Sequence, residues 1–482
     1  MKSKYLYCGG MLFLLAAVLG LGYLDTPKTT RTQQHLTYNT DIADTSYAID
    51  AETFTSHLPV VSIDTGGAVI PGKPEDGQLV RNIPNSYVQA DMKIFEKNGE
   101  LNSLNQKPDI DSRIQIRVRG NSSRAFDKTG YLFKFINKEE QEKSYSVMGM
   151  EEDSTWILHG PYLDKTLMRN YMWYNLSGQI MEWAPDVRYC EVFLNGAYQG
   201  IYVMTEQIGV AEGRVEVTKY RSGAPVTSYI VCVDRTSVND VDYLDNFTGY
   251  TERLQSRVEI KYPGAKKLTP ELTDYISKDF SRFEKSLYSY DYDSRRYGYQ
   301  TFIDVDNFVD YFIINEVTQN TDAGLFSTYF YKDVAGKLKL AVWDFNNCCD
   351  NYMEEQLPMA GFFMQSRPWF FMLTKDEIFV NKVIIRYREL RKGILSDESM
   401  DDYISSVQDY LGPAIERNYQ VWGYSFQPDN DLLTQEFRKI GSYEEAVAQY
   451  RQRLISHMNW MDDHIEDLNF YSHESKNKKF NH

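Results

Sequence analysis

Apolar and polar residues alternate along the first half of the chain in a pattern that predicts β-strands. Between Arg113 and Arg119, the residues Ile114, Ile116 and Val118 share one side of an extended chain, and polar residues occupy the other side. An Asn-Gly pair between two apolar runs is typical of a tight turn that joins antiparallel strands. The other strands predicted here are 131–135 and a hairpin of 191–194 and 201–204 around Asn195-Gly196.

Beyond about residue 265, apolar residues recur every three or four positions, which predicts amphipathic helices. Thr269-Pro270 indicates a helix start, with a cap residue before a proline at the first helical position. Ser442 and Glu445 have the spacing of a capping box, and the apolar stripe that follows them indicates core packing rather than a cofactor site. The remaining predicted helices are 308–317 and, in the strand-rich half, 167–176 with Asp164 as its N-cap.

Strands followed by helices indicate an α+β protein with two lobes, a strand-rich N-lobe and a helical C-lobe. A chain of 482 residues with 42% hydrophobic content can bury a large core. The expected parts are an N-terminal segment 1–25, a flexible stalk 26–54, a main domain 55–395 (N-lobe 55–210, C-lobe 211–395), a helical extension 396–470 and a polar tail 471–482.

The first residues of the chain indicate in which cellular compartment the protein is located. Lys2 and Lys4 precede a nearly unbroken apolar run from Tyr5 to Leu24. A run of this length is typical of either a cleaved signal peptide or a single membrane-spanning anchor. In both cases we expect the residues after Asp25 to lie outside the cytoplasm, and only this first segment to contact a membrane.

Charge and cysteine content narrow the function classes. The formal net charge of −16 argues against a nucleic-acid partner, which requires clustered Lys and Arg. The sequence contains no C-x-x-C or His-rich spacing, and this argues against a zinc site. Cys190, Cys232, Cys348 and Cys349 follow the N-terminal segment, and outside the cytoplasm they form one or two disulfides or stay as buried thiols.

Asp322 and Asp344 are the strongest candidates for catalytic chemistry. Asp322 follows a predicted helix, and Asp344 ends the second strand of a predicted hairpin that turns at Gly336. In protein kinases a catalytic Asp precedes two short strands, and a second Asp holds the magnesium that bridges the phosphates. We therefore interpret Asp322 as the base that accepts a hydroxyl proton and Asp344 as a metal ligand. Taken singly, Asp322 is more simply a turn residue at a helix C-terminus, and Asp344 a strand-end residue that bonds the local backbone. The ordered set of Gly loop, strand Lys, helix, hairpin, Asp and Asp favours the functional interpretation.

Three further features complete that set. Arg119-Gly120-Asn121-Ser122-Ser123 joins two predicted strands, and small residues there let backbone amides approach phosphates, although a plain turn has the same composition. Lys134 lies in the next strand, where a kinase lysine pairs with the α- and β-phosphates, or on a solvated strand face. Glu206 ends the predicted hairpin and is a candidate partner for a lysine or the nucleotide.

The residue identities of the motifs add to the evidence from their spacing. Taken together, they resemble the CotH kinase family, and the resemblance covers residues 110–350 in the right order. It implies an atypical protein kinase with a divergent kinase-like fold, which uses ATP and Mg²⁺ (or Mn²⁺) to phosphorylate Ser or Thr of surface or coat proteins. It assigns Asp322 as the catalytic residue and Asp344 as the metal ligand, with Lys134 in the lysine-bearing strand. The motifs are Arg119–Ser123, Lys165–Asn170, Glu191–Gly196 with Tyr198–Gly200, Thr205–Ile208, Lys261–Pro263 and Val342–Phe345.

One position departs from the family pattern. The family commonly continues Trp-Asp-Phe-Asp, whereas this chain has Asn346 after Phe345. An Asn can ligate a metal through its carbonyl oxygen but brings no charge, so a lower Mg²⁺ affinity is expected. The alternatives are therefore an exported protein kinase and a non-catalytic surface protein that keeps the fold as a binding module. A carbohydrate-active enzyme ranks third, because only aromatic residues and scattered carboxylates favour it.

Overall fold

The computed structural model describes residues 31–38, 43–75, 83, 85–97, 99–234, 243–251, 256–351, 357–426 and 440–473. Residues from Gln34 onwards form one compact unit. The predicted N-terminal segment 1–25 lies outside the described residues, and so does most of the predicted polar tail. No helix in the described part of the chain combines the length and apolarity needed to cross a bilayer.

Seven strands close into a barrel in the order β1-β2-β3-β4-β5-β7-β6. Neighbouring strands are antiparallel except for β1 and β6, which pair in parallel and close the barrel. The strands are β1 Val60–Asp64, β2 Val88–Phe95, β3 Ile110–Val118, β4 Tyr131–Ile136, β5 Thr155–His159, β6 Val187–Leu194 and β7 Ala197–Glu206.

The alternation seen in the sequence decides which side chains fill the barrel. Ile114 and Ile116 of β3 and Phe133 and Phe135 of β4 are fully buried in one apolar cluster with Trp156 of β5. The predicted hairpin is confirmed as β6 and β7. Its turn residues Asn195 and Gly196 both have positive φ, at 50° and 78°, as a tight turn between twisted strands requires.

A second sheet has four antiparallel strands in the order β11-β10-β8-β9. The predicted hairpin that turns at Gly336 supplies β10 and β11, which pair from Tyr329 with Ala341 to Tyr331 with Lys339. The strands are β8 Tyr229–Asp234, β9 Arg257–Tyr262, β10 Thr328–Lys332 and β11 Lys339–Ala341. The mixed α+β class is thus confirmed, with a closed barrel in the strand-rich half.

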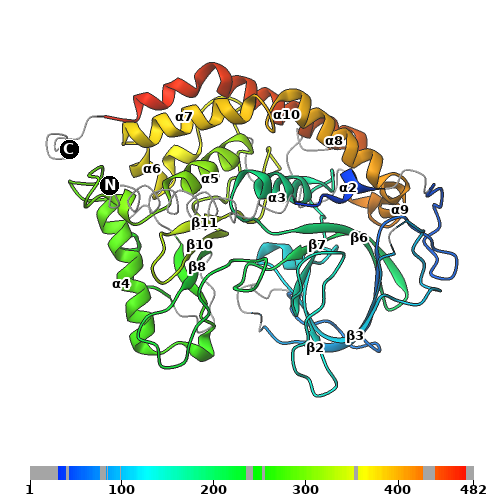
Figure 1. The fold of residues 1–482 in the computed structure, drawn as a ribbon. Coiled ribbons are helices and arrows are strands. Elements are labelled where there is room, and N and C mark those ends of the chain that lie inside the picture. Colours follow the sequence, from blue (N-terminus) through cyan, green and yellow to red (C-terminus); the bar gives the residue numbers. More distant parts are fainter. Residues whose placement is uncertain are drawn as a thin grey trace, which may run out of the picture. The chain divides into compact units, whose positions relative to one another are not determined.

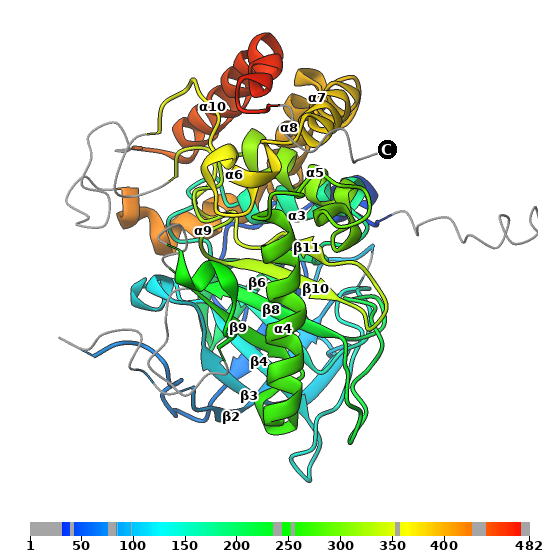
Figure 2. The same cartoon turned by 90° about the vertical axis from the view of Figure 1, so that its left-hand side faces the viewer.

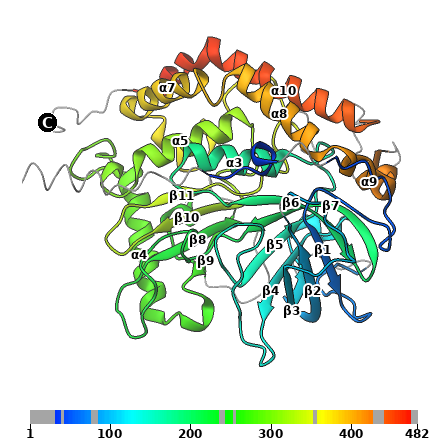
Figure 3. The ribbon, with the colours of Figure 1, turned by 45° about the vertical axis from the view of Figure 1, so that its right-hand side comes forward.

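Helices cover both sheets. Figures 1 and 3 show α3 and α5 lying between the strands and an outer layer of α7, α8 and α10. Figure 2 faces α4, which packs against the second sheet through Phe280, 5.3 Å from the ring of Phe330 in β10. The helices are α2 Gln34–Thr37, α3 Arg169–Ile180, α4 Pro270–Leu287, α5 Val305–Val317, α6 Phe370–Leu373, α7 Glu377–Arg391, α8 Asp397–Leu411, α9 Pro413–Trp422 and α10 Tyr443–His464.

The helix caps follow the sequence with one exception. Thr269 caps α4 by accepting a hydrogen bond from Leu272 N, and Ser442 caps α10 in the same way through Glu445 N. The prediction that Asp164 is the N-cap of the next helix was wrong, because α3 begins only at Arg169. Asp164 instead closes a preceding turn, in which Leu167 has a φ of 64°, and its carboxylate accepts hydrogen bonds from the backbone N–H and guanidinium of Arg169.

Candidate active site

Asp322 lies in a tight turn that begins where α5 ends. Asn320 N donates to Asn315 O of α5 (3.0 Å), and the N–H groups of Leu325 and Phe326 donate to Asp322 O (3.0 and 2.7 Å). These bonds fold the chain back at once from the helix towards β10. Asp322 itself is only 7% exposed, so it lies in a buried turn rather than on a solvated loop.

Asp344 follows β11 and faces the same turn. Its N–H donates to the Tyr174 hydroxyl (3.0 Å), and its carbonyl accepts from Asn320 Nδ2 (3.1 Å). Its φ of 59° is unusual for a residue other than glycine, and Asp tolerates this conformation better than most. The amide of Asn320 therefore joins the two turns that carry the predicted carboxylates.

The residues after Asp344 complete the junction. Asn347 Nδ2 donates to Asp322 Oδ2 (3.1 Å), and Asn346 N donates to Asp344 Oδ1 (3.2 Å). Asn170, at the start of α3, bonds both Phe345 N (2.8 Å) and Asn346 Oδ1 (3.4 Å). Three predicted site residues, Asp322, Asp344 and Asn346, thus meet in one hydrogen-bonded cluster, which we call the acidic junction together with Asn320 and Asn347.

The predicted phosphate loop reaches the acidic junction through Arg119. Its guanidinium carbon lies 5.6 Å from the ring centre of Trp343, the residue before Asp344. Gly120 has a φ of 112°, and a Cβ there would lie 2.1 Å from Ser123 Oγ. Ser122 and Ser123 begin a short 3-10 turn, Ser122–Ala125, while Asn121 Nδ2 lies 3.4 Å from Asp234 Oδ1. Only glycine fits at position 120, which is consistent with a tightly folded loop.

The charge of Asp344 acts on two buried side chains, His159 and Tyr174. Burial lowers the pKa of His159, at the end of β5, to about 4, while Asp344 opposes this shift and Arg119 adds to it. The same charges act on Tyr174. Burial and the charge of Asp344 raise the pKa of its hydroxyl. The charges of Arg119 and Asp344 thus act in opposite directions on both groups. His159 is accordingly neutral at pH 7, and Arg119 supplies the positive charge.

Lys134 and Glu206 take part in other contacts. Lys134 Nζ lies 2.7 Å from Glu142 Oε1 on the outer side of β4, and its side chain is 31% exposed. Glu206 is buried at the end of β7, where its carboxylate accepts from Asp186 N (2.8 Å). Burial lowers the pKa of Arg214, and the negative charge of Glu206 opposes this shift. None of these partners belongs to the acidic junction, so the roles of Lys134 and Glu206 stay predictions.

The oxygen donors of the junction fit a hard cation that is completed by phosphates. The described residues contain no group of three or more His, Cys, Asp or Glu that could hold a metal by themselves. Mg²⁺ commonly binds through one or two carboxylates plus substrate phosphates, so Asp344 and Asn346 form a donor set of that kind. Asn320 Oδ1 and Thr321 Oγ1, next to Asp322, are buried without a partner in the described part of the chain, which leaves polar atoms for a ligand.

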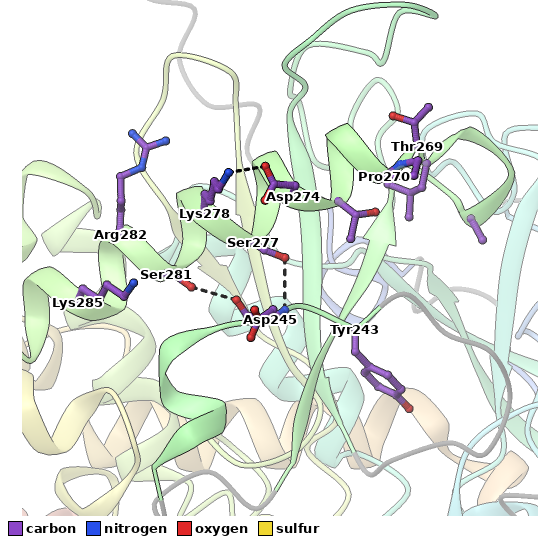
Figure 4. Close-up of a pocket in the computed structure, with 13 residues that line it drawn as sticks. Tyr243, Asp245, Thr269, Pro270, Asp274, Ser277, Lys278, Ser281, Arg282 and Lys285 are labelled. Carbon is purple, nitrogen blue, oxygen red and sulfur yellow. Dashed lines mark hydrogen bonds and ion pairs between the residues drawn. The ribbon is translucent and has the colours of Figure 1, made fainter.

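A separate cavity of about 970 Å³ follows the exposed face of α4. Figure 4 shows Lys278, Arg282 and Lys285 projecting from α4, with Ser277 and Ser281 bonded to the backbone of Asp245 below them. None of the predicted site residues lines it. Lys278 is paired with Asp274 at 2.7 Å, and both side chains are exposed, so this ion pair contributes little to stability.

Sequence reasoning missed the residues that hold the junction in place. Tyr174 and Asn170 come from α3, so they are distant from Asp344 in the chain. Arg169 Nε also donates to Cys348 O (3.0 Å) and fixes the segment after Asp344. The motif Lys165–Asn170 was the one available signal. The four described cysteines are all free and buried, which favours the buried-thiol alternative.

Comparison with known proteins agrees with the motifs. The family model described as CotH kinase protein matches residues 116–467. The match includes every predicted site residue from Arg119 to Asn346. No curated protein matches the chain. Because the family model covers most of the sequence, the chain belongs to the CotH kinase family.

Proposed function

We propose that the protein is an ATP-dependent kinase that phosphorylates Ser or Thr residues of surface or coat proteins. The observation that carries the proposal is the acidic junction, in which the Asn347 amide bonds Asp322 and the next-door backbone N–H of Asn346 bonds Asp344. A base and a metal-binding carboxylate are thereby held by one short segment. This is the pair of groups that phosphoryl transfer requires.

Each residue has a definite task in this proposal. Asp322 accepts the proton of the acceptor hydroxyl as that oxygen forms its bond to the γ-phosphorus. The bond from the γ-phosphorus to the bridging oxygen breaks, and ADP leaves with the electron pair. Asp344 and Asn346 would hold Mg²⁺ or Mn²⁺, which supplies positive charge to the phosphate oxygens. Arg119 and the Gly120–Ser123 loop, with Lys134 and Glu206 as further candidates, would bind the nucleotide.

The order of elements supports a two-lobed kinase-like arrangement as part of the proposal. The barrel would serve as the N-lobe, with its β3–β4 loop next to the phosphates. The second sheet and its helices would serve as the C-lobe. The sequence Asp, hairpin, Asp is shared with protein kinases, whereas a closed seven-stranded barrel is not, so the correspondence concerns the order of the catalytic parts.

We further propose that the protein is exported, either secreted or anchored by residues 1–25. The apolar run from Tyr5 to Leu24 supports this. Fusion of residues 1–40 to a reporter that is active only outside the cytoplasm tests it. Reporter activity is expected, and its absence would contradict export.

The experiment for the kinase proposal is transfer of labelled phosphate from ATP with Mg²⁺ or Mn²⁺ to a Ser-rich acceptor. The variant Asp322→Asn keeps the size of the side chain and removes the base. The matched control Asp306→Asn alters an exposed carboxylate of α5 that pairs only with Lys382 among the described residues. Loss of transfer in the first variant alone supports the proposal. Equal transfer in both would contradict it.

A non-catalytic binding module is the second candidate, and Asn346 favours it. This residue brings no charge, and its Oδ1 already accepts from Asn170 Nδ2 at 3.4 Å. With a weaker metal site, the protein would bind the nucleotide without transferring its γ-phosphate. Thermal stabilisation by Mg-ATP with no phosphate transfer in either metal would favour this candidate. The substitution Asn346→Asp would then be expected to increase Mg²⁺ affinity.

A further inference from the structure

Arg367 lies against the Asp322 turn although it is distant in sequence. Its Nη2 donates to Thr321 O (2.8 Å), the carbonyl directly before Asp322. Its pKa is lowered to about 10 by burial, and the nearby charges of Asp322 and then Glu316 oppose this shift. The guanidinium therefore bonds the backbone of the Asp322 turn, and the charges of Asp322, the proposed base, and Glu316 act on it.

Glu316 fixes the segment that presents Arg367. Its buried carboxylate accepts hydrogen bonds from Phe363 N (2.8 Å) and Met364 N (2.7 Å), at the start of the 3-10 turn Met364–Ser366. Glu316 stands in the last turn of α5, the helix that leads into the Asp322 turn. Both ends of the contact between Arg367 and Thr321 are thus attached to the same helix end.

The aliphatic part of Arg367 also fits the turn closely. Gly324 has a φ of 81°, and a Cβ there would lie 2.8 and 2.9 Å from Arg367 Cβ and Cγ. On the other side the guanidinium carbon is 3.8 Å from the ring centre of Phe363. The side chain is confined between the glycine backbone and an aromatic ring, so it can hold only a narrow range of orientations.

We propose that Arg367 is a positioning residue for Asp322. It holds the turn through Thr321 and places a fixed positive charge beside the carboxylate that accepts the substrate proton. The role in catalysis rests on the kinase activity proposed above. The contact between Arg367 and the turn is independent of that activity.

Two variants of the full chain separate charge from geometry. Arg367→Met keeps much of the apolar stem and removes both the charge and the hydrogen bond, whereas Arg367→Lys keeps the charge. For Arg367→Met we expect kcat to fall about 10- to 100-fold, the effect of losing one hydrogen bond from a charged group, while KM for ATP stays within about threefold. Millimolar guanidinium is expected to restore part of the activity, and Arg367→Lys to retain more of it. The matched control is Arg386→Met, because Arg386 pairs with Asp310 on another part of α5.

Hydrogen exchange gives a readout that needs no activity. Amides of Leu325 and Phe326, which donate to Asp322 O, are expected to exchange faster in Arg367→Met and unchanged in Arg386→Met. Wild-type exchange rates in Arg367→Met would overturn the proposal, and so would wild-type kcat or activity that guanidinium does not restore. If the wild-type protein transfers no phosphate, the kinase proposal fails, and with it the catalytic role of Arg367. Faster exchange in Arg367→Met would then still establish the contact as a structural one.

Discussion

Arg417 of α9 lies at the centre of a buried ion-pair network. Its Nη2 is 2.7 Å from Glu191 Oε2 on β6 and 3.0 Å from Asp44 Oδ2, and the Arg417 and Glu191 side chains are both 0% exposed. His57 Nδ1 lies 2.8 Å from the same Asp44 oxygen. The network therefore joins Asp44 of the predicted stalk, Glu191 of the barrel and Arg417 of the predicted C-terminal extension. The boundaries of the stalk and the extension stay predictions.

The substitution Arg417→Met would leave two carboxylates buried without their cation. Breaking a buried ion pair in this way costs about 3–5 kcal/mol. The compact unit runs from Gln34 to His482, so an unfolding entropy of about 2.1 cal/mol/K per residue gives roughly 0.9 kcal/mol/K. The melting temperature should therefore fall by about 3–5 °C.

Calorimetry of the wild type and variant measures this change. Arg388→Met serves as the control, because its pair with Glu466 is solvent-exposed and should contribute less than about 1 kcal/mol. The double variant Arg417→Met/Glu191→Gln should recover part of the loss, since it removes one of the unpaired charges. A fall of 1 °C or less in Arg417→Met, equal to the control, would show that the buried network does not stabilise the fold.

Three further predictions concern the junction, the loop and acid stability. Asn347→Ala should lower kcat about tenfold, because Asp322 loses a hydrogen bond worth about 1.5 kcal/mol; unchanged kcat in steady-state kinetics would contradict this. Gly120→Ala should weaken the binding of Mg-ATP, because a Cβ at a φ of 112° would overlap Ser123 Oγ; calorimetric titration measures this affinity, and a wild-type value would count against a phosphate loop. Burial pushes the pKa of Asp44 up, but His57 and Arg417 outweigh it and hold the pKa at about 2, below the ordinary 3.8. The associated stability is present above about pH 4 and is lost as pH falls towards 2, by about 2 kcal/mol; urea unfolding across this range should show a smaller loss in Asp44→Asn, and equal losses would refute it.

Local patterns predicted the elements that carry the site. Alternation gave β3 and β4, and the Asn-Gly pair gave the β6–β7 turn, because each depends only on neighbouring residues. The closure of the barrel depends on the parallel pairing of β1 with β6, which are more than 100 residues apart, and no local period records such a pairing. The start of α3 was misplaced for a related reason, since the Asp164–Arg169 ion pair stabilises a turn before the helix.

The candidate site likewise combines residues that local spacing indicates with residues from distant elements. Asp322, Asp344 and Asn346 could be predicted to lie near one another, because their spacing around one hairpin is local. The residues that fix them come from other elements, as with Tyr174 of α3 and Arg367 beyond α5. The strand position of Lys134 makes it a candidate, but strand position alone does not reveal that Glu142 is its partner.

Phosphate transfer by residues 26–482 decides whether this protein is a kinase. The assay uses labelled ATP with Mg²⁺ or Mn²⁺, and it compares the wild type with Asp322→Asn and with the exposed-site control Asp306→Asn. The account predicts label on the protein or on a Ser-rich acceptor with the wild type and the control, and its loss with Asp322→Asn. No transfer by correctly folded wild-type protein in either metal, or equal transfer by Asp322→Asn, would contradict it.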